Sequence, residues 1–328
     1  MKRIFIIALV GLCVLTNPLK AQDVHFSQFN ASPMTLNPAM TGNIWCTYRA
    51  AINYRNQWNT IPAPYVTYSG AFDAALWKNR MGGDAVGVGL LLMNDVSGDG
   101  NLTNMNANLS LAYHKTLGEG TLLSAGFQGS FVQKNVDMSS LIFGTQIDGN
   151  GNVTPGSGEP FGGGFYYFDL AAGVHWSTVF NDNFSANLGG AYYHILRPVE
   201  SFLNDNSNRL DPRYVAHGGV MIAPNETINF SPSFLYMQQA GAKEITVGSS
   251  MGYHLDAASL YFGAWYRNTD AIIALTGIEV SQFLFGFSYD VTISDASKAN
   301  NYQGAFELSL SYTGCVTPKR RVLNCPRF

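Results

Sequence analysis

Charged residues are scarce in this sequence. Asp, Glu, Lys and Arg together make up 12 % of its 328 residues, against roughly 25 % in an average globular chain. A soluble enzyme of this length would lack the charge that normally covers its surface. The 46 % share of hydrophobic residues also excludes a disordered chain. No block of like charge suggests a contact with nucleic acid, so nucleic acid is not expected as a partner.

Long apolar runs are also missing, with one exception near the N-terminus. A membrane-spanning helix needs about 18 apolar residues or more, and the one run that approaches this length is Ile4 to Leu15. Lys2 and Arg3 precede it, and the small residue Ala21 follows a short polar stretch. This arrangement predicts a secretory signal peptide over residues 1–21. We therefore expect an exported protein.

What the sequence does contain is regular alternation of apolar and polar residues. From Trp45 onward, stretches of about 9 to 14 residues alternate with period two and are separated by turn residues, which predicts strands. In residues 103–114 the odd positions are mainly apolar, and the even positions are mainly Asn, Ser or His. The same two faces recur in residues 283–292 and 306–312.

A membrane barrel explains these strands better than a soluble sandwich does. Strands of a sandwich are mostly 5 to 6 residues long and carry charge on their outer face, whereas these are longer and their polar face is Asn, Ser, Gly, Gln and His. About 9 to 11 tilted residues cross a membrane in a barrel, apolar outward and polar inward. The sequence therefore predicts an all-β, antiparallel outer-membrane barrel with lipid around it.

The alternating stretches predict about 14 strands. They are 45–54, 65–77, 84–95, 101–115, 120–133, 165–178, 183–196, 212–223, 226–238, 243–255, 258–268, 270–280, 282–292 and 302–314. The longer connections follow odd strands, as expected if the N-terminus is periplasmic and long loops face outward. The barrel is thus placed at 45–314, a periplasmic lead or plug segment at 22–44, and a basic periplasmic tail at 315–328.

No residue pattern indicates an enzyme, a cofactor or a metal centre. His114, His175 and His254 are predicted to point into the lumen near its periplasmic rim, where hydrogen bonding within the wall is the expected role. No zinc-type spacing of Cys and His occurs, and nothing brings a nucleophile, a base and an orienting group together. The glycines within strands are expected to let the sheet bend and to keep the interior uncrowded.

Three cysteines remain after the signal peptide: Cys46, Cys315 and Cys325. In a closed antiparallel barrel the first and last strands are neighbours, so Cys46 and Cys315 would lie at the same periplasmic end. A disulfide between them would join the two strands at the seam. The pairs Cys315 with Cys325 and Cys46 with Cys325 remain alternatives.

Several motifs resemble one family of barrels. Phe26-Ser27-Gln28-Phe29, Leu36-Asn37-Pro38-Ala39 with Gly42, and Tyr54-Arg55-Asn56-Gln57-Trp58 look like the opening motifs of the PorP/SprF family of type IX secretion and gliding-motility outer-membrane proteins. The segment from Tyr68 to Asp73 and the closing Cys325-Pro326-Arg327-Phe328 are similar as well. The resemblance extends over the whole mature chain.

The resemblance implies a non-enzymatic barrel in the outer membrane of a Bacteroidota-type cell. Its expected partners are a secreted adhesin with a C-terminal sorting domain, and a periplasmic peptidoglycan-binding lipoprotein together with type IX secretion components. The motifs do not divide the chain between the adhesin-anchoring and the core-secretion subgroups.

On this interpretation the barrel is a scaffold. Tyr54, Arg55, Asn56, Gln57 and Trp58, with loops 134–164 and 197–211, would bind an adhesin at the cell surface. Residues 22–44 would face the periplasmic machinery, together with a tail whose basic residues are Lys319, Arg320 and Arg321. The alternative is a channel or transporter for small solutes, because 14 strands leave a lumen that could pass or hold a ligand.

Overall fold

Residues 23–59, 63–81, 83–156, 163–203, 208–295, 297–300 and 302–316 are described by the computed structural model. The predicted signal peptide and the tail beyond residue 316 lie outside these ranges. Within them, helices are short, and none is both long and apolar enough to cross a membrane.

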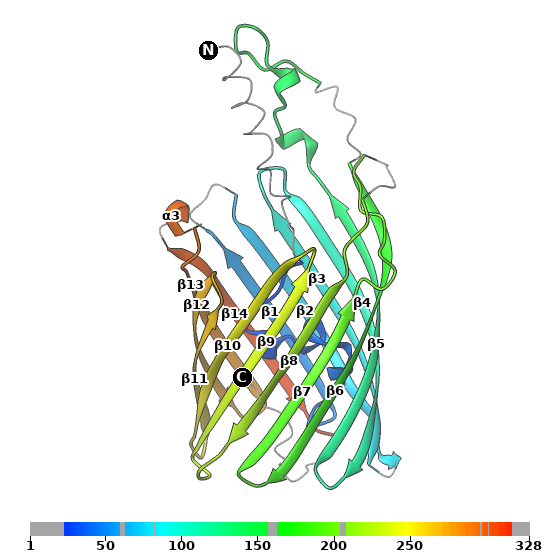
Figure 1. The fold of residues 1–328 in the computed structure, drawn as a ribbon, viewed down its shortest axis with the longest axis vertical. Helices are drawn as coiled ribbons and strands as arrows, with labels where there is room; N and C mark the ends of the chain where they lie inside the picture. Colours follow the sequence, from blue (N-terminus) through cyan, green and yellow to red (C-terminus); the bar gives the residue numbers. More distant parts are fainter. Residues whose placement is uncertain are drawn as a thin grey trace, which may run out of the picture.

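Fourteen antiparallel strands close into one barrel, as the alternation predicts (Figure 1). They are β1 (Tyr48–Gln57), β2 (Tyr65–Met81), β3 (Asp84–Ser97), β4 (Leu102–Gly118), β5 (Thr121–Asn135), β6 (Gly164–Asn181), β7 (Phe184–Tyr193), β8 (Arg213–Ile222), β9 (Ile228–Gln239), β10 (Ala242–His254), β11 (Ala258–Arg267), β12 (Ala271–Val280), β13 (Phe283–Thr292) and β14 (Gln303–Gly314). Each strand pairs with its neighbours in the chain, and β1 closes the barrel on β14 from Tyr48 opposite Gly314 to Gln57 opposite Ala305. Closure pairs the backbone groups that hydrocarbon could not satisfy.

The predicted strand positions agree closely with the structure, and the differences have local causes. β1 begins three residues later than predicted and continues through Gln57, because its residues 55–57 still pair with β14. β7 ends at Tyr193 because His194 has a φ of 61°, in the left-handed region that interrupts a strand.

The wall is taller on one side. β2 to β6 are 14 to 18 residues long, whereas β7 to β14 are 10 to 13. The long connection between β5 and β6 continues this side beyond the barrel, at the top of Figure 1, and contains η4 (Met138–Ser140) and η5 (Gly144–Gln146). The short helix α3 (Ser297–Asn300) lies at the same end. Because outer-membrane barrels have short periplasmic turns and longer outer loops, we assign this end to the cell exterior.

The two faces of the wall follow the predicted parity for most strands. On β4 the alternate residues Leu109 and Leu111 are exposed on the outside, whereas Asn108, Ser110 and His114 are buried inside. The expectation of a uniformly polar interior is wrong for β9, β11 and β12. These strands carry apolar residues toward the lumen, namely Leu235, Met237, Tyr261, Trp265, Ile273 and Leu275. The reason is that another part of the chain packs against them.

Candidate functional site

The lumen contains a segment of the chain itself. Residues 23–44, here called the plug segment, precede β1 and lie inside the barrel (Figure 1). They form η2 (Phe29–Ala31), α2 (Pro33–Leu36) and η3 (Pro38–Met40). Pro33 and Pro38 each stand at the first helical position, which suits a residue without an amide hydrogen. Most plug side chains are buried.

One end of the plug segment is attached near the outer end of the lumen. Asp23 Oδ2 contacts His194 Nε2 at 2.6 Å, and the other ring nitrogen of His194 contacts Asp169 of β6 at 2.6 Å. Arg213 of β8 lies 3.5 Å from the same Asp23 oxygen. We call Asp23, His194 and Asp169 the outer latch.

The outer latch shifts the pKa of two of its members. Burial by itself raises the pKa of Asp23, but the hydrogen bond from His194 and the positive charge of Arg213 lower it overall. Burial by itself lowers the pKa of His194, but its hydrogen bonds with Asp169 and Asp23 raise it above the ordinary value of 6.5. Both shifts favour the charged pair.

The Phe26-Ser27-Gln28-Phe29 motif binds a carboxylate of the wall. The backbone amides of Ser27 and Gln28 donate to the two oxygens of Glu307 at 2.7 and 2.9 Å. The Gln28 side chain donates to the Glu307 carbonyl at 3.2 Å and accepts from the Ser309 hydroxyl at 2.8 Å. Glu307 is 1 % exposed. It therefore holds two successive plug amides in a site closed to solvent.

The Ser27 hydroxyl lies at the centre of a buried charge cluster. It donates to Asp290 Oδ2 at 2.6 Å and accepts from Arg55 at 2.8 Å and Arg267 at 2.6 Å. Arg55 also pairs with Glu307, and Arg267 pairs with Asp290 at 3.1 Å. Burying a charge is costly unless it is paired. The plug motif thus completes a cluster that the wall supplies from β1, β11, β13 and β14.

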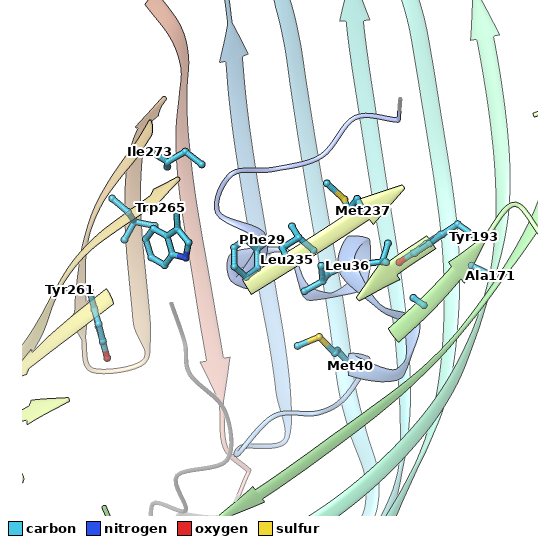
Figure 2. Packing of buried hydrophobic residues seen from close by; sticks show 13 residues of the cluster. Phe29, Leu36, Met40, Ala171, Tyr193, Leu235, Met237, Tyr261, Trp265 and Ile273 are labelled. Carbon is cyan, nitrogen blue, oxygen red and sulfur yellow. The ribbon is translucent and has the colours of Figure 1, made fainter. Parts of the chain in front are cut away.

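Apolar packing fixes the same part of the plug segment. Phe29, Leu36 and Met40 point from the plug toward the wall (Figure 2). The ring of Phe29 meets the edge of Trp265 with centroids 6.4 Å apart. Burying one such side chain is worth about 1.5–3 kcal/mol. The apolar lumen residues of β9, β11 and β12 therefore form the surface on which the plug rests.

The Leu36-Asn37-Pro38-Ala39 motif binds the opposite wall through a fully buried amide. Asn37 Nδ2 donates to the carbonyls of Val174 at 2.9 Å and Gly190 at 3.3 Å and contacts His217 Nε2 at 3.1 Å. Asn37 Oδ1 accepts from the Ala39 amide at 2.9 Å and so caps η3. A buried amide with these partners satisfies its hydrogen-bonding groups.

Glycine allows the plug backbone to touch the wall. A Cβ at Gly126 of β5 would lie 2.5 Å from the carbonyl of Pro38, and a Cβ at Gly87 of β3 would overlap the Thr41 carbonyl. At these two positions the strand glycines keep the interior uncrowded, which is the role expected from the sequence. They leave space for η3 and for the turn that follows it.

The end of the plug is held by residues of β2 and β4. The Gly42 amide donates to Asp73 Oδ2 at 2.7 Å, and Arg49 holds both oxygens of Asp73 through its Nε and Nη2 at 3.0 and 2.8 Å. His114 contacts the Thr41 carbonyl at 2.8 Å and the Ser124 hydroxyl at 2.7 Å. The Tyr68-to-Asp73 motif therefore ends in a residue that receives the plug.

The predicted lumen histidines have different neighbours. His114 and His175 are buried against the plug, the latter 3.3 Å from the Asn43 amide. His254 lies nearer the periplasmic mouth and contacts Asn229 and Ser259. Over the described ranges, no group of three or more His, Cys, Asp or Glu side chains could hold a metal ion.

The structure separates the predicted partner-binding residues 54–58. Arg55 is 4 % exposed and is engaged with Glu307 and Ser27, so the prediction that it binds an adhesin at the surface is wrong. The reason is strand parity, because positions 53, 55 and 57 face inward. Gln57 accepts from Arg55 at 3.1 Å.

The other three residues of this motif belong to the outer side of the wall. The ring of Tyr54 packs 5.1 Å from Tyr68, and Trp58 packs edge-on against Tyr65 at 5.3 Å. The Asn56 amide donates to the Tyr54 hydroxyl at 3.3 Å. Their contact with a partner stays a prediction.

The structure contains the disulfide between Cys46 and Cys315, one of the three pairings that the sequence left open, with Cα atoms 4.7 Å apart. It joins the start of β1 to the end of β14. Cys325, Lys319, Arg320 and Arg321 lie outside the described residues, so the predicted contact of the basic tail with a periplasmic partner stays a prediction.

A cavity of about 570 Å³ lies below the plug, toward the periplasmic mouth. Its lining comes from the plug, from β1 and from the periplasmic ends of β6 to β14, and includes Met40, Ile44, Tyr261, Glu279 and Leu284. A smaller cavity of about 70 Å³ lies on the other side of the plug, beside the outer latch. The plug segment thus separates an outer from a periplasmic compartment.

Ser27, Asn37 and Asp73 stand out in the sequence only as parts of motifs, and no sequence pattern assigns a role to Arg267 or Asp290. One feature of the sequence does indicate buried ion pairs in the lumen. Charged residues at lumen-facing positions inside membrane strands are expensive and need partners. Arg55 and Glu307 follow this pattern in the alternation, but the alternation does not show that the plug completes their cluster.

Comparisons with known proteins give a family and a fold. The family model described as "Type IX secretion system membrane protein PorP/SprF" matches residues 19–312. No curated protein matches the sequence.

Solved structures of similar shape are outer-membrane barrels. The toluene transporter TbuX of Ralstonia pickettii has 12 % identity and a TM-score of 0.50, with 85 % of this chain and 92 % of that chain covered. The monoaromatic hydrocarbon channel CymD has 11 % identity and a TM-score of 0.50, with 87 % and 93 % covered. A FadL homologue of Pseudomonas aeruginosa has 12 % identity and a TM-score of 0.50, with 84 % and 92 % covered. At such identities the likeness concerns the fold alone.

Proposed function

Because the chain belongs to the PorP/SprF family of type IX secretion system membrane proteins, we propose that this outer-membrane barrel is a non-enzymatic scaffold of that system. It supports the secretion of large adhesins and holds them at the cell surface. Its periplasmic face docks to the peptidoglycan-binding lipoprotein and to other components of the machinery.

The occupied lumen is the observation that carries this proposal. The plug segment is bound by Glu307 and Asp290 on one side and by Asn37 contacts with β6 and β7 on the other. A barrel built for free passage gains nothing from so many buried contacts across its lumen. A scaffold does gain from them, because they stiffen a wall that must bear load from both sides of the membrane.

The two ends of the barrel suit two different partners. The outer end carries the tall β5–β6 hairpin and the long connection between β7 and β8, while the periplasmic end has short turns (Figure 1). An extended outer surface of this kind offers the area that a stable protein contact requires. The aromatic side chains of Tyr54 and Trp58, near the outer end of β1, are candidate anchors.

A mild-detergent pull-down with mass spectrometry tests the proposal. A tagged copy expressed in its own cells should retain an adhesin with a C-terminal sorting domain and a periplasmic peptidoglycan-binding lipoprotein. An unrelated outer-membrane barrel with the same tag is the control. Deleting the gene and finding adhesins secreted and retained as before would contradict the scaffold.

A second candidate is a channel or transporter for small solutes. The cavity of about 570 Å³ is in the size range of small-molecule sites, and the barrels of similar fold include a toluene transporter and a monoaromatic hydrocarbon channel. Steady conductance of the purified full-length protein in planar bilayers, or solute uptake that depends on it, would favour this candidate.

A further inference from the structure

We propose that the periplasmic cavity is the binding site of this chain's own basic C-terminal segment, residues 317–328. The occupant is inferred from three observations: where the described chain ends, the charge around the mouth of the cavity, and the side chains that line it. The inference does not depend on the secretion role.

The described chain ends at the edge of the cavity. Ser311 and Thr313 of β14 line it. The Cys315 disulfide then fixes the chain beside Cys46, and the Val316 amide donates to the Thr47 hydroxyl at 3.1 Å. Residues 317–328 therefore start at the mouth, and an extended chain of this length spans roughly 40 Å. Being tethered raises the local concentration of the tail to about the millimolar range.

Four acidic residues stand around the mouth of the cavity, whereas the cation in its lining, Arg49, is already paired with Asp73. Asp182, Glu226 and Asp256 occupy the periplasmic turns that follow β6, β8 and β10, and Glu279 lies near the end of β12. These three turns and the turn after β12 contain no Lys or Arg. The tail carries Lys319, Arg320, Arg321 and Arg327. The tail and the turns around the mouth therefore carry opposite charges.

The interior of the cavity suits the last residues of the tail. Met40 and Ile44 of the plug contribute apolar surface, with Tyr261 and Leu284 of the wall. Glu279 accepts a hydrogen bond from the Tyr261 hydroxyl at 2.8 Å, so a carboxylate lies beside this surface. The terminal pair Arg327-Phe328 offers a cation and an aromatic ring that match the two kinds of surface.

Disulfide trapping in the full-length protein tests the proposal, because Cys325 provides a natural reporter. Gln282→Cys places a thiol in the cavity lining, and mild oxidation should link it to Cys325. The matched control is Asn106→Cys, which lines the small cavity on the far side of the plug. We expect at least about tenfold more cross-link for Gln282→Cys, in line with the effective concentration of a tethered segment. Peptide mapping of the intact Cys46–Cys315 bridge shows that each variant is folded.

A second measurement needs no new cysteine. A zero-length carbodiimide reagent should join Lys319 to Asp182, Glu226 or Glu279 in the wild-type protein.

Removing two charges with Asp182→Asn and Glu226→Gln should reduce Gln282→Cys trapping severalfold. The same loss of charge on the outer loops, Asp137→Asn with Asp148→Asn, should leave it unchanged. Equal trapping at positions 282 and 106, or a tail cross-linked only to a periplasmic partner, would overturn the proposal.

Discussion

At the scale of single residues, Glu307 joins the plug segment to the wall. Its carboxylate accepts the amides of Ser27 and Gln28 and pairs with Arg55. These bonds cross sequence separations of up to 280 residues. Such a residue contributes to the folded barrel only when all its partners are in place, because an unpaired charge in this site would be buried without compensation.

Glu307→Gln should therefore weaken the attachment of the plug. The change leaves Arg55 with less compensating charge, and we expect a loss of about 3 kcal/mol in the free energy of unfolding, measured by urea unfolding in lipid vesicles. Glu119→Gln, at an exposed turn after β4, is the matched control and should change stability by less than about 0.5 kcal/mol. Similar small effects for both variants would contradict the role given to Glu307.

The outer latch should respond to pH. The pKa of His194 is raised above 6.5, so its contribution is present below that pH and is lost as the pH rises through the folded pKa. The pKa of Asp23 is lowered below 3.8, so its contribution is present above that pH and is lost as the pH falls toward the folded pKa. The attachment of Asp23 should thus be strongest between these two ordinary values.

Hydrogen exchange of the amides next to Asp23, corrected for its intrinsic pH dependence, measures how firmly Asp23 is attached at each pH. Protection should fall as the pH rises above the folded pKa of His194, and His194→Gln should abolish the dependence. His254→Gln, which alters a lumen histidine that contacts Asn229 and Ser259, should leave it in place. A pH profile that His194→Gln does not change would contradict the latch.

At the scale of elements, the plug helices and the strands fit through small residues. η3 lies against β5 where Gly126 leaves room for the Pro38 carbonyl. β9, β11 and β12 meet the plug with apolar side chains instead (Figure 2). One side of the lumen thus receives the plug backbone closely, and the other side receives its apolar side chains.

Gly126→Ala should displace η3. Its Cβ would lie 2.5 Å from the Pro38 carbonyl, which forces a shift of the plug or of the strand and costs about 1–3 kcal/mol of stability. Gly129→Ala on the same strand is the control, because its Cβ would meet only Leu170 at an ordinary 3.9 Å. Limited proteolysis of the plug segment should increase for the first variant alone. Equal cleavage of the two variants would argue against close packing at η3.

At the scale of the whole molecule, the plug segment divides the lumen of a barrel that is otherwise wide enough for passage. Barrels of 8 strands are filled by their own side chains, whereas those of 16 to 18 strands leave an aqueous channel. With 14 strands, this one requires an additional segment to occupy the interior.

Removing residues 23–44 should therefore open the barrel. The wild-type protein should show no steady conductance in planar bilayers, and the deletion should conduct, since its strands retain their pairing around an emptied lumen. Deleting residues 144–154 of the outer excursion is the control and should leave the barrel closed. Heat-dependent migration in detergent gels verifies that each variant is a folded barrel. A wild-type protein that conducts as well as the deletion would contradict closure by the plug.

The sequence by itself determined the barrel. Alternation in stretches such as residues 103–114 specified the strands, their number and their outward faces, because the side-chain period of a strand is a local property. The low charge followed from the same arrangement, since lipid covers the outer face. Strand ends were less well determined, as at His194, where one left-handed residue ends β7.

Only the tertiary structure decided what the inward faces meet. Parity places Arg55 and Glu307 in the lumen, but it does not show that Ser27 lies between them. The placement of the plug segment, the burial of Arg55 and the apolar lumen surface of β9, β11 and β12 all depend on contacts between residues far apart in the chain. Alternation records which face a side chain occupies, whereas its partner across the lumen is fixed only when the closed barrel brings the two together.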